Sequence, residues 1–235
     1  AHTKAIVVSD SLAGDCLRGL RVLQAMDTAG KGGSVRHVVG GADPQGVDHF
    51  AIKAPTEQER KHDFLWRIRP HLPGPGRIGV FDRSHYEDVL IGRVHQLADA
   101  AEIERRYDAI NEFEAELLGS GTTIVKCMLH ISAKEQKERL LARLDDPSKY
   151  WKFNPGDVDE RGHWAEYREA YEIALERTNT EVAPRYLIPS DTTWFRNLAA
   201  PDLLLSTLAR TSPVWPVADF DPEEQARGIT INAAC

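Results

Sequence analysis

Cysteine, methionine and long apolar runs are scarce in this sequence. Its 235 residues include only three cysteines and two methionines. The cysteines, at positions 16, 127 and 235, are too few and too far apart for a disulfide framework or a zinc motif. No apolar run approaches the roughly 20 residues of a membrane span, and the apolar stretch at residues 5–8 is too short for a signal peptide. We therefore expect a cytoplasmic protein with no membrane partner.

Basic residues are also fewer than acidic residues. The formal net charge is −7, which argues against a general nucleic-acid or membrane-surface binder. With 42% hydrophobic and 28% charged residues, the composition is that of an ordinary globular protein. We expect one domain over residues 1–235, and any polyanion it binds must be held by local clusters of basic side chains.

Short apolar runs alternate with longer amphipathic segments along the chain. This alternation predicts an α/β fold, with a parallel sheet and helices on both faces. In such sheets ligands bind beyond the carboxyl ends of the strands, so the residues after each strand carry the chemistry. The expected strands are 20–26, 47–52, 77–82, 122–130 and 186–189. The expected helices are 34–39, 56–72, 84–94, 100–118, 132–144, 159–178 and 194–210, followed by an irregular tail from residue 212.

A glycine-rich segment follows the first expected strand. Residues 25–34 read Ala-Met-Asp-Thr-Ala-Gly-Lys-Gly-Gly-Ser, a turn that enters a helix and presents backbone N–H groups to one point. It resembles a P-loop, except that Ala25 replaces the first glycine and Gly32 replaces the hydroxyl residue that ligates Mg²⁺. Asp27 is the expected substitute ligand, although a plain turn with a solvated lysine would show the same glycines. The expected phosphate-binding residues are Thr28, Ala29, Gly30, Lys31, Gly32, Gly33 and Ser34.

A second polar segment follows the third expected strand. Asp82 stands where P-loop enzymes place a carboxylate that holds Mg²⁺, and Arg83 beside it can neutralise a transferring phosphoryl group. The alternative is a polar pair that merely ends a strand. Glu87 has capping-box spacing from Ser84, so a helix cap and a substrate role are equally good interpretations.

Basic residues gather again in the segment 132–178, which we interpret as a helical lid. Arg139 and Arg143 are four residues apart and share a helix face. Lys149 and Lys152 lie in the aromatic, turn-rich stretch that follows, which suits a flap closing over an anionic substrate. Glutamates on the same helix leave open a solvated face of ordinary ion pairs.

Together these segments resemble the polyphosphate kinase 2 family. The matching stretches are Leu-Gln-Ala-Met-Asp-Thr-Ala-Gly-Lys-Gly-Gly at 23–33, Phe-Asp-Arg-Ser-His-Tyr-Glu-Asp-Val-Leu at 81–90 and Asp-Pro-Ser-Lys-Tyr-Trp-Lys-Phe at 146–153. Shorter pieces at 43–46, 50–56, 63–67 and 181–184 extend the resemblance over residues 20–208. The pieces near residues 45–46 and 85–87 look most like the subgroup that phosphorylates nucleoside mono- and diphosphates.

The resemblance implies a P-loop kinase fold with a helical lid, and Mg²⁺-dependent phosphoryl transfer between inorganic polyphosphate and a nucleotide. It implies catalytic roles for Asp27, Lys31, Asp82 and Arg83, with Arg139 or Arg143 closing from the lid. Asp27 and Asp82 would hold the metal. The nucleotide would contact Asp82, His85 and Glu87, and Lys149 and Lys152 would add phosphate contacts.

Two other functions remain open from the residues. An ATP-dependent nucleoside monophosphate kinase would use the same loop and lid. A polyphosphate- or nucleotide-binding module would retain a degenerate loop, as Ala25 and Gly32 suggest, without turnover. The reaction direction, the base preference and the choice between a mono- and a diphosphate acceptor are also open. We expect a homo-oligomer, since helices with apolar outer faces can pair subunits.

Overall fold

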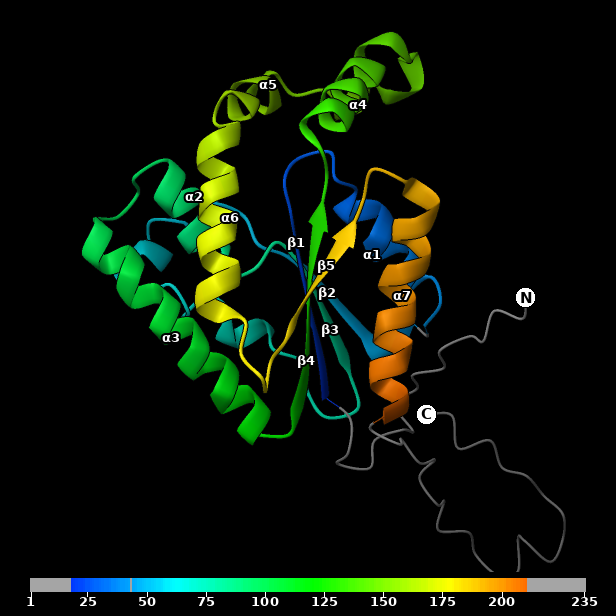
Figure 1. Cartoon of the computed structure of the whole chain (residues 1–235). Coiled ribbons are helices and arrows are strands. Elements are labelled where there is room, and N and C mark those ends of the chain that lie inside the picture. Colours follow the sequence, from blue (N-terminus) through cyan, green and yellow to red (C-terminus); the bar gives the residue numbers. More distant parts are fainter. Residues whose placement is uncertain (1–17, 43, 211–235) are drawn as a thin grey trace, which may run out of the picture.

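A five-stranded parallel sheet forms the centre of the molecule (Figure 1). The structure is a computed structural model that describes residues 18–42 and 44–210. The strand order is β2–β3–β1–β4–β5. The inner strands β1 and β4 are buried along almost their whole length, as expected for a sheet covered on both faces. The strands are β1 Arg18–Ala25, β2 Val47–Ala51, β3 Ile78–Asp82, β4 Thr122–His130 and β5 Arg185–Pro189.

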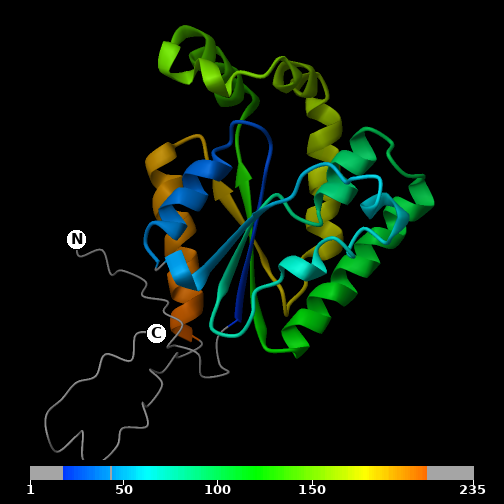
Figure 2. The ribbon, with the colours of Figure 1, turned by 180° about the vertical axis from the view of Figure 1, so that it is seen from behind.

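Helices cover both faces of the sheet, which confirms the predicted α/β architecture (Figures 1 and 2). On one face, α1 (Lys31–Val39) and α7 (Thr193–Arg210) pack over a core that includes Leu23 and Leu204. On the other face, α2 (Glu87–Val94), α3 (Ala100–Gly119) and α6 (Trp164–Thr178) pack over a core that includes Phe113. Among the described residues, no helix combines the length and the apolar character needed to cross a bilayer.

The segment between β4 and α6 lies beyond the carboxyl ends of the strands (Figure 1). It contains α4 (Ala133–Asp145), the 3₁₀ helix η5 (Pro147–Lys152) and α5 (Pro155–Gly162). Ser132 caps α4 by accepting from the Glu135 N–H at 3.1 Å, as the capping-box spacing predicts. The single helix expected over 159–178 is divided at His163, which ends α5 and precedes α6.

The helix predicted over 56–72 is wrong, although its start signal is real. Thr56 and Glu59 exchange the two capping-box hydrogen bonds, at 2.6 and 3.2 Å. Only two short 3₁₀ turns follow, η3 (Glu59–Lys61) and η4 (Arg69–His71), with turns between them. Asp63 accepts from the Leu65 N–H, which competes with helical bonding, and Pro70 disfavours a helical residue before it. Three of the apolar residues of the segment, Phe64, Leu65 and Ile68, are nevertheless buried.

A further 3₁₀ helix, η2 (Pro44–Gly46), precedes β2. The other predicted elements differ from the observed ones by a few residues at their ends, which is ordinary for helix and strand boundaries. The irregular tail predicted from residue 212 lies outside the described residues.

A buried ionic cluster joins β4 to α3 and α6. The Lys126 ammonium donates to the Glu114 carboxylate at 2.6 Å and to the Thr178 carbonyl at 2.7 Å. Tyr86 also donates to Glu114, at 2.6 Å. Burial lowers the pKa of Lys126 despite the opposing effect of Glu114. Burial by itself would raise the pKa of Glu114, but hydrogen bonding to His85 and the Lys126 charge outweigh it and lower that pKa. Each of the two charges needs the other as its partner, because neither side chain is exposed to water.

We expect Glu114→Ala to lower the free energy of unfolding by about 3–5 kcal/mol, because it leaves the Lys126 charge buried in the core without its partner. Glu116→Ala is the matched control on the same helix, because Glu116 forms an exposed pair with Arg69. The control should cost no more than about 1 kcal/mol. Urea denaturation of both variants measures the difference, and equal losses would contradict the assignment.

Candidate active site

The loop from β1 to α1 contains two residues in the left-handed region of backbone space. Thr28 has a φ of 63° and Gly30 a φ of 101°. The turn closes with a hydrogen bond from the Ala29 N–H to the Met26 carbonyl at 3.3 Å. Alternation of right- and left-handed residues makes successive N–H groups converge, which is the geometry of an anion-binding nest. This geometry is the one expected of the anion site that the sequence predicts at the carboxyl end of β1.

The helix after this loop begins at Lys31 rather than at Ser34. Gly32, Gly33 and Ser34 consequently lie in its first turn, where the leading N–H groups have no partner inside the helix. The Ser34 N–H is the first to bond back, to the Gly30 carbonyl at 3.0 Å. The Lys31 ammonium donates to the Ala25 carbonyl at 3.0 Å, which holds its charge over the loop.

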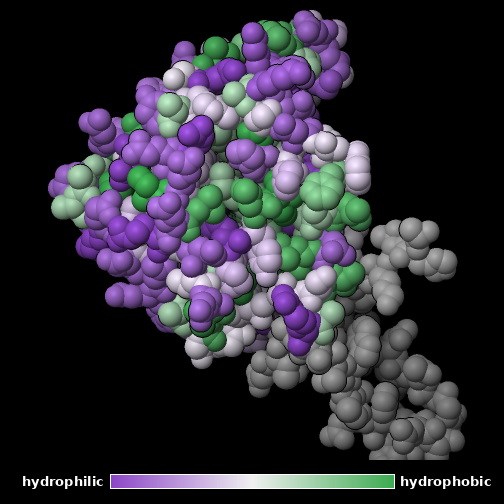
Figure 3. All heavy atoms as spheres, in the orientation of Figure 1, coloured by the Kyte–Doolittle hydropathy of each residue, from purple (hydrophilic) through white to green (hydrophobic). Residues whose placement is uncertain are grey.

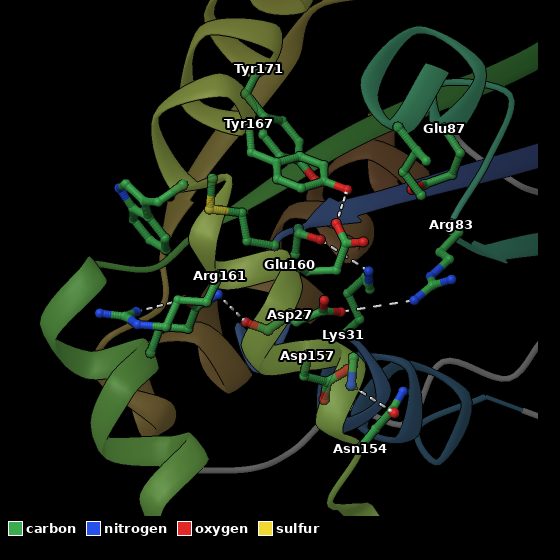
Figure 4. A pocket seen from close by; sticks show the side chains of 16 residues that line it. Asp27, Lys31, Arg83, Glu87, Asn154, Asp157, Glu160, Arg161, Tyr167 and Tyr171 are labelled. Carbon is green, nitrogen blue, oxygen red and sulfur yellow. Dashed lines mark hydrogen bonds and ion pairs between the residues drawn. The ribbon is translucent and has the colours of Figure 1, made fainter. Parts of the chain in front are cut away.

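A cavity of about 270 Å³ opens beside the loop. Figure 4 shows Asp27 and Lys31 reaching it from the loop, and Arg83 and Glu87 from the segment after β3. Helices α4, α5 and α6 complete the walls. The other lining residues are Ala25, Met26, Ile91, Gln136, Asn154, Gly156, Asp157, Glu160, Arg161, Trp164, Tyr167 and Tyr171.

The charged groups from the two loops face each other across this cavity (Figure 4). An Arg83 Nη lies 3.9 Å from an Asp27 Oδ. Arg83 itself has a φ of 65°, a conformation that costs a non-glycine residue energy and is found at functional sites. Burial raises the pKa of Glu87, and the Lys31 and Arg83 charges oppose that rise. Glu87 thus lines the pocket instead of capping α2, whose N-terminus has no side-chain cap.

Three buried oxygens at the site lack a hydrogen-bond partner within the described part of the chain: Thr28 Oγ1, Ser34 Oγ and Glu87 Oε1. Buried polar atoms are normally satisfied. Thr28 and Ser34 belong to the loop and to the first turn of α1, whereas Glu87 begins α2 and lines the cavity. No three histidine, cysteine, aspartate or glutamate side chains within the described ranges form a metal-binding group.

The lid side of the cavity is fixed by hydrogen bonds between helices. The Glu160 carboxylate on α5 accepts from the Tyr167 hydroxyl at 2.6 Å, and lies 3.0 Å from the His95 Nε2. Burial alone would raise the pKa of Glu160, but these two partners lower it. Arg161 donates to the Gln136 side chain at 2.7 Å, which ties α5 to α4. The aromatic side chains of Tyr167 and Tyr171 lie above these charges (Figure 4).

The two arginines expected to close from the lid are bonded to protein groups. Arg139 donates to the carbonyls of Thr28, Ser190 and Asp191, at 3.0, 2.7 and 2.9 Å. Arg143 donates to the Asp157 carboxylate at 2.6 Å and to the Lys152 carbonyl at 3.1 Å. Neither lines the cavity.

The other predicted residues also lie outside the cavity lining. Asp82 is the last residue of β3 and pairs in register with Leu23, so it lies on the strand next to the loop. His85 is completely buried, with its ring 5.4 Å from that of Phe113. Lys149 and Lys152 belong to η5, where Lys149 pairs with Asp146 at 2.8 Å and Lys152 lies over the Trp151 ring.

The structure thus brings together four predicted residues, Asp27, Lys31, Arg83 and Glu87. Pattern reasoning missed the contribution of Glu160 and of the aromatic wall. The sequence also did not predict the break at His163, which divides the segment into α5 and α6. Only the aromatic content of α6 offered a signal, and tryptophan or tyrosine on a helix is more often a packing residue.

Comparisons with known proteins agree with this geometry. The family model described as polyphosphate kinase 2 matches residues 10–214. An AMP/ADP-polyphosphate phosphotransferase from Meiothermus ruber is 45% identical over 213 residues, covering 91% of this chain and 78% of its own length. An ADP-polyphosphate phosphotransferase from Rhodopseudomonas palustris is 42% identical, covering 84% of this chain and 72% of its own length.

Solved structures give the same result. The crystal structure of polyphosphate kinase 2 from Arthrobacter aurescens TC1 superposes with a TM-score of 0.88 at 57% identity, over 91% of this chain and 76% of that one. These matches favour the expected enzyme type over an ATP-dependent nucleoside monophosphate kinase. With the phosphate loop and its cavity, they show that this chain belongs to the polyphosphate kinase 2 family.

Proposed function

We propose that this chain transfers a phosphoryl group between inorganic polyphosphate and a nucleotide, with Mg²⁺ as cofactor. The observation that carries the proposal is the convergence of Lys31, Asp27, Arg83 and Glu87 on one cavity beside the phosphate loop. The names of the relatives from Meiothermus ruber and Rhodopseudomonas palustris support AMP or ADP as the acceptor, or the reverse reaction.

Different residues of the chain have different roles in the transfer. The loop N–H groups and Lys31 hold the donor phosphates, and Arg83 neutralises charge that develops as the phosphoryl group moves. Asp82 and Glu87, at the end of β3 and the start of α2, orient the acceptor. The aromatic wall and α5 exclude water from the reacting groups. Phosphoryl transfer needs little covalent help, so positioning and charge account for most of the rate.

The donor set fits Mg²⁺. This ion is usually bound through one or two carboxylates together with substrate phosphates, rather than by an all-protein cage. Asp27 lies in the cavity and Asp82 ends the neighbouring strand, so these two carboxylates would hold it. When bound, Mg²⁺ neutralises phosphate charge during transfer.

Two further expectations remain proposals. The lid, predicted over 132–178, would close through α4 and α5, because α6 contributes Tyr171 and Ala174 to the core. A homo-oligomer would use the apolar face over β5 and α7 (Figure 3), where Leu187, Trp194 and Leu198 are exposed. The proposed location is the cytoplasm.

We expect ATP to form when the protein is incubated with ADP, Mg²⁺ and polyphosphate in the absence of any other nucleotide. Luminescence detection of ATP and the parallel shortening of polyphosphate measure the reaction, and AMP replaces ADP in a second series. Formation of ATP only when a nucleoside triphosphate is supplied would instead favour the nucleoside monophosphate kinase. Binding without turnover would favour the non-catalytic module.

Lys31→Ala and Asp82→Ala should each lower kcat on the order of 10²–10³-fold with the fold intact, since each removes charge preorganised for the transition state. Lys134→Ala is the control, because that lysine lies on the exposed side of α4 and pairs with Glu138 at 3.9 Å. Steady-state kinetics and circular dichroism check both expectations. A folded Lys31→Ala variant that transfers at the normal rate would refute the assignment of the loop.

A further inference from the structure

We propose that Arg196, with Arg139, holds the phosphate loop in its anion-binding conformation as a positioning residue. The inference rests on the proposed function of the loop. It assigns a role to a buried arginine on α7 that the sequence patterns did not single out, and it gives Arg139 a different task from direct closure on phosphate.

The first observation is that Arg196 contacts the backbone of the loop. Its guanidinium is buried and donates to the Ala29 carbonyl at 3.0 Å. Arg139 donates to the preceding carbonyl, that of Thr28, at 3.0 Å. Two consecutive carbonyls of an irregular loop are thereby bound by guanidiniums from two different helices, α7 and α4. Loop carbonyls inside a protein need such partners, because the sheet and the helix offer them none.

The second observation concerns the direction of the N–H groups. The described chain contains no cis peptide bonds, and in a trans peptide the C=O and N–H groups point in opposite directions. Anchoring the Ala29 carbonyl toward α7 therefore turns the Gly30 N–H to the opposite side of the loop. A peptide that flipped would present its carbonyl oxygen to a phosphate and repel it. The two arginines thus select the peptide orientation that an anion requires.

The third observation is that Arg196 leaves little room for a side chain at Gly30 and Gly33. A Cβ atom on Gly30 would collide with the Arg196 guanidinium, and one on Gly33 would lie 3.2 Å from its Nη2. The flat guanidinium therefore lies against bare backbone at two points of the loop. Gly30 is required both for its left-handed conformation and for this contact.

The fourth observation is the charge itself. Burial lowers the pKa of Arg196, and the Arg139 charge adds to that effect, so two cations lie near each other behind the loop. Arg196 bonds to the Ala29 carbonyl and to the side-chain oxygen of Asn197. Asn197 in turn contacts His37 of α1 at 2.8 Å. Because these partners are neutral oxygens, the positive potential of Arg196 remains available to an anion on the loop.

The test compares Arg196→Ala and Arg196→Lys with Arg210→Ala, a control on the exposed end of the same helix. We expect Arg196→Ala to lower kcat/KM for polyphosphate by about 10- to 100-fold, because the loop loses its fixed geometry. The KM for the nucleotide should stay within twofold. Arg196→Lys should be intermediate, since lysine keeps the charge without the planar fork. Guanidinium ion at millimolar concentration should restore activity to Arg196→Ala and not to Arg210→Ala.

A second measurement tests the contact without relying on activity. Gly30→Ala should reduce the free energy of unfolding more in the wild-type background than in Arg196→Ala, because only the former contains the colliding guanidinium. Equal costs in the two backgrounds would overturn the contact. If Arg196→Ala changes the KM for polyphosphate and the KM for the nucleotide in proportion, and guanidinium ion restores no activity, then Arg196 has only a structural role. If the wild-type protein transfers no phosphoryl group, the proposed function fails, while the stability cycle still decides the contact.

Discussion

The orientation of a few peptide groups at the end of β1 is the constraint on which the site depends. Parallel strands bring every strand-end loop to one edge of the sheet, and the left-handed residues Thr28 and Gly30 fold the first of these loops into a nest. Left-handed turns are costly for threonine, so the surrounding structure must hold them. Hydrogen bonds from α4 and α7 to the loop carbonyls provide that support. The conformation of the loop at one edge of the sheet thus depends on two helices that are distant from it in the sequence, α4 and α7.

Charge balance explains how a protein with a net charge of −7 can receive a polyanion. The cavity lining has four carboxylates and three cationic side chains, so its own charge attracts little phosphate. Most of the carboxylates are already engaged: Asp27 with Arg83, Asp157 with Arg143, and Glu160 with Tyr167 and His95. Glu87 is the exception, and its pKa is raised. The loop dipoles and Lys31 are therefore the groups that attract phosphate, and the proposed Mg²⁺ would add positive charge together with the substrate.

The sequence predicted the fold well because its strands are apolar and bounded by clear turn signals. It predicted the loop because glycine and lysine in that order have one main structural use. Prediction from the sequence was less accurate where a local signal competed with tertiary interactions. The capping box at Thr56 forms, yet no α-helix follows, because Asp63 and Pro70 favour turns. Likewise, the spacing of Arg139 and Arg143 predicted a shared face correctly but could not reveal that their donors bind backbone and Asp157.

The break at His163 shows why the remainder of the site was beyond pattern reasoning. Glu160 and Tyr167 are seven residues apart, so a continuous helix would also place them on one face, two turns apart. The break at His163 instead puts them on two helices, and their side chains are hydrogen-bonded across it. Tyr171, one turn further along α6, lines the cavity and also belongs to the core. On the α6 side, the wall of the cavity is consequently part of the packed core. On the α5 side, the wall is held in place by hydrogen bonds.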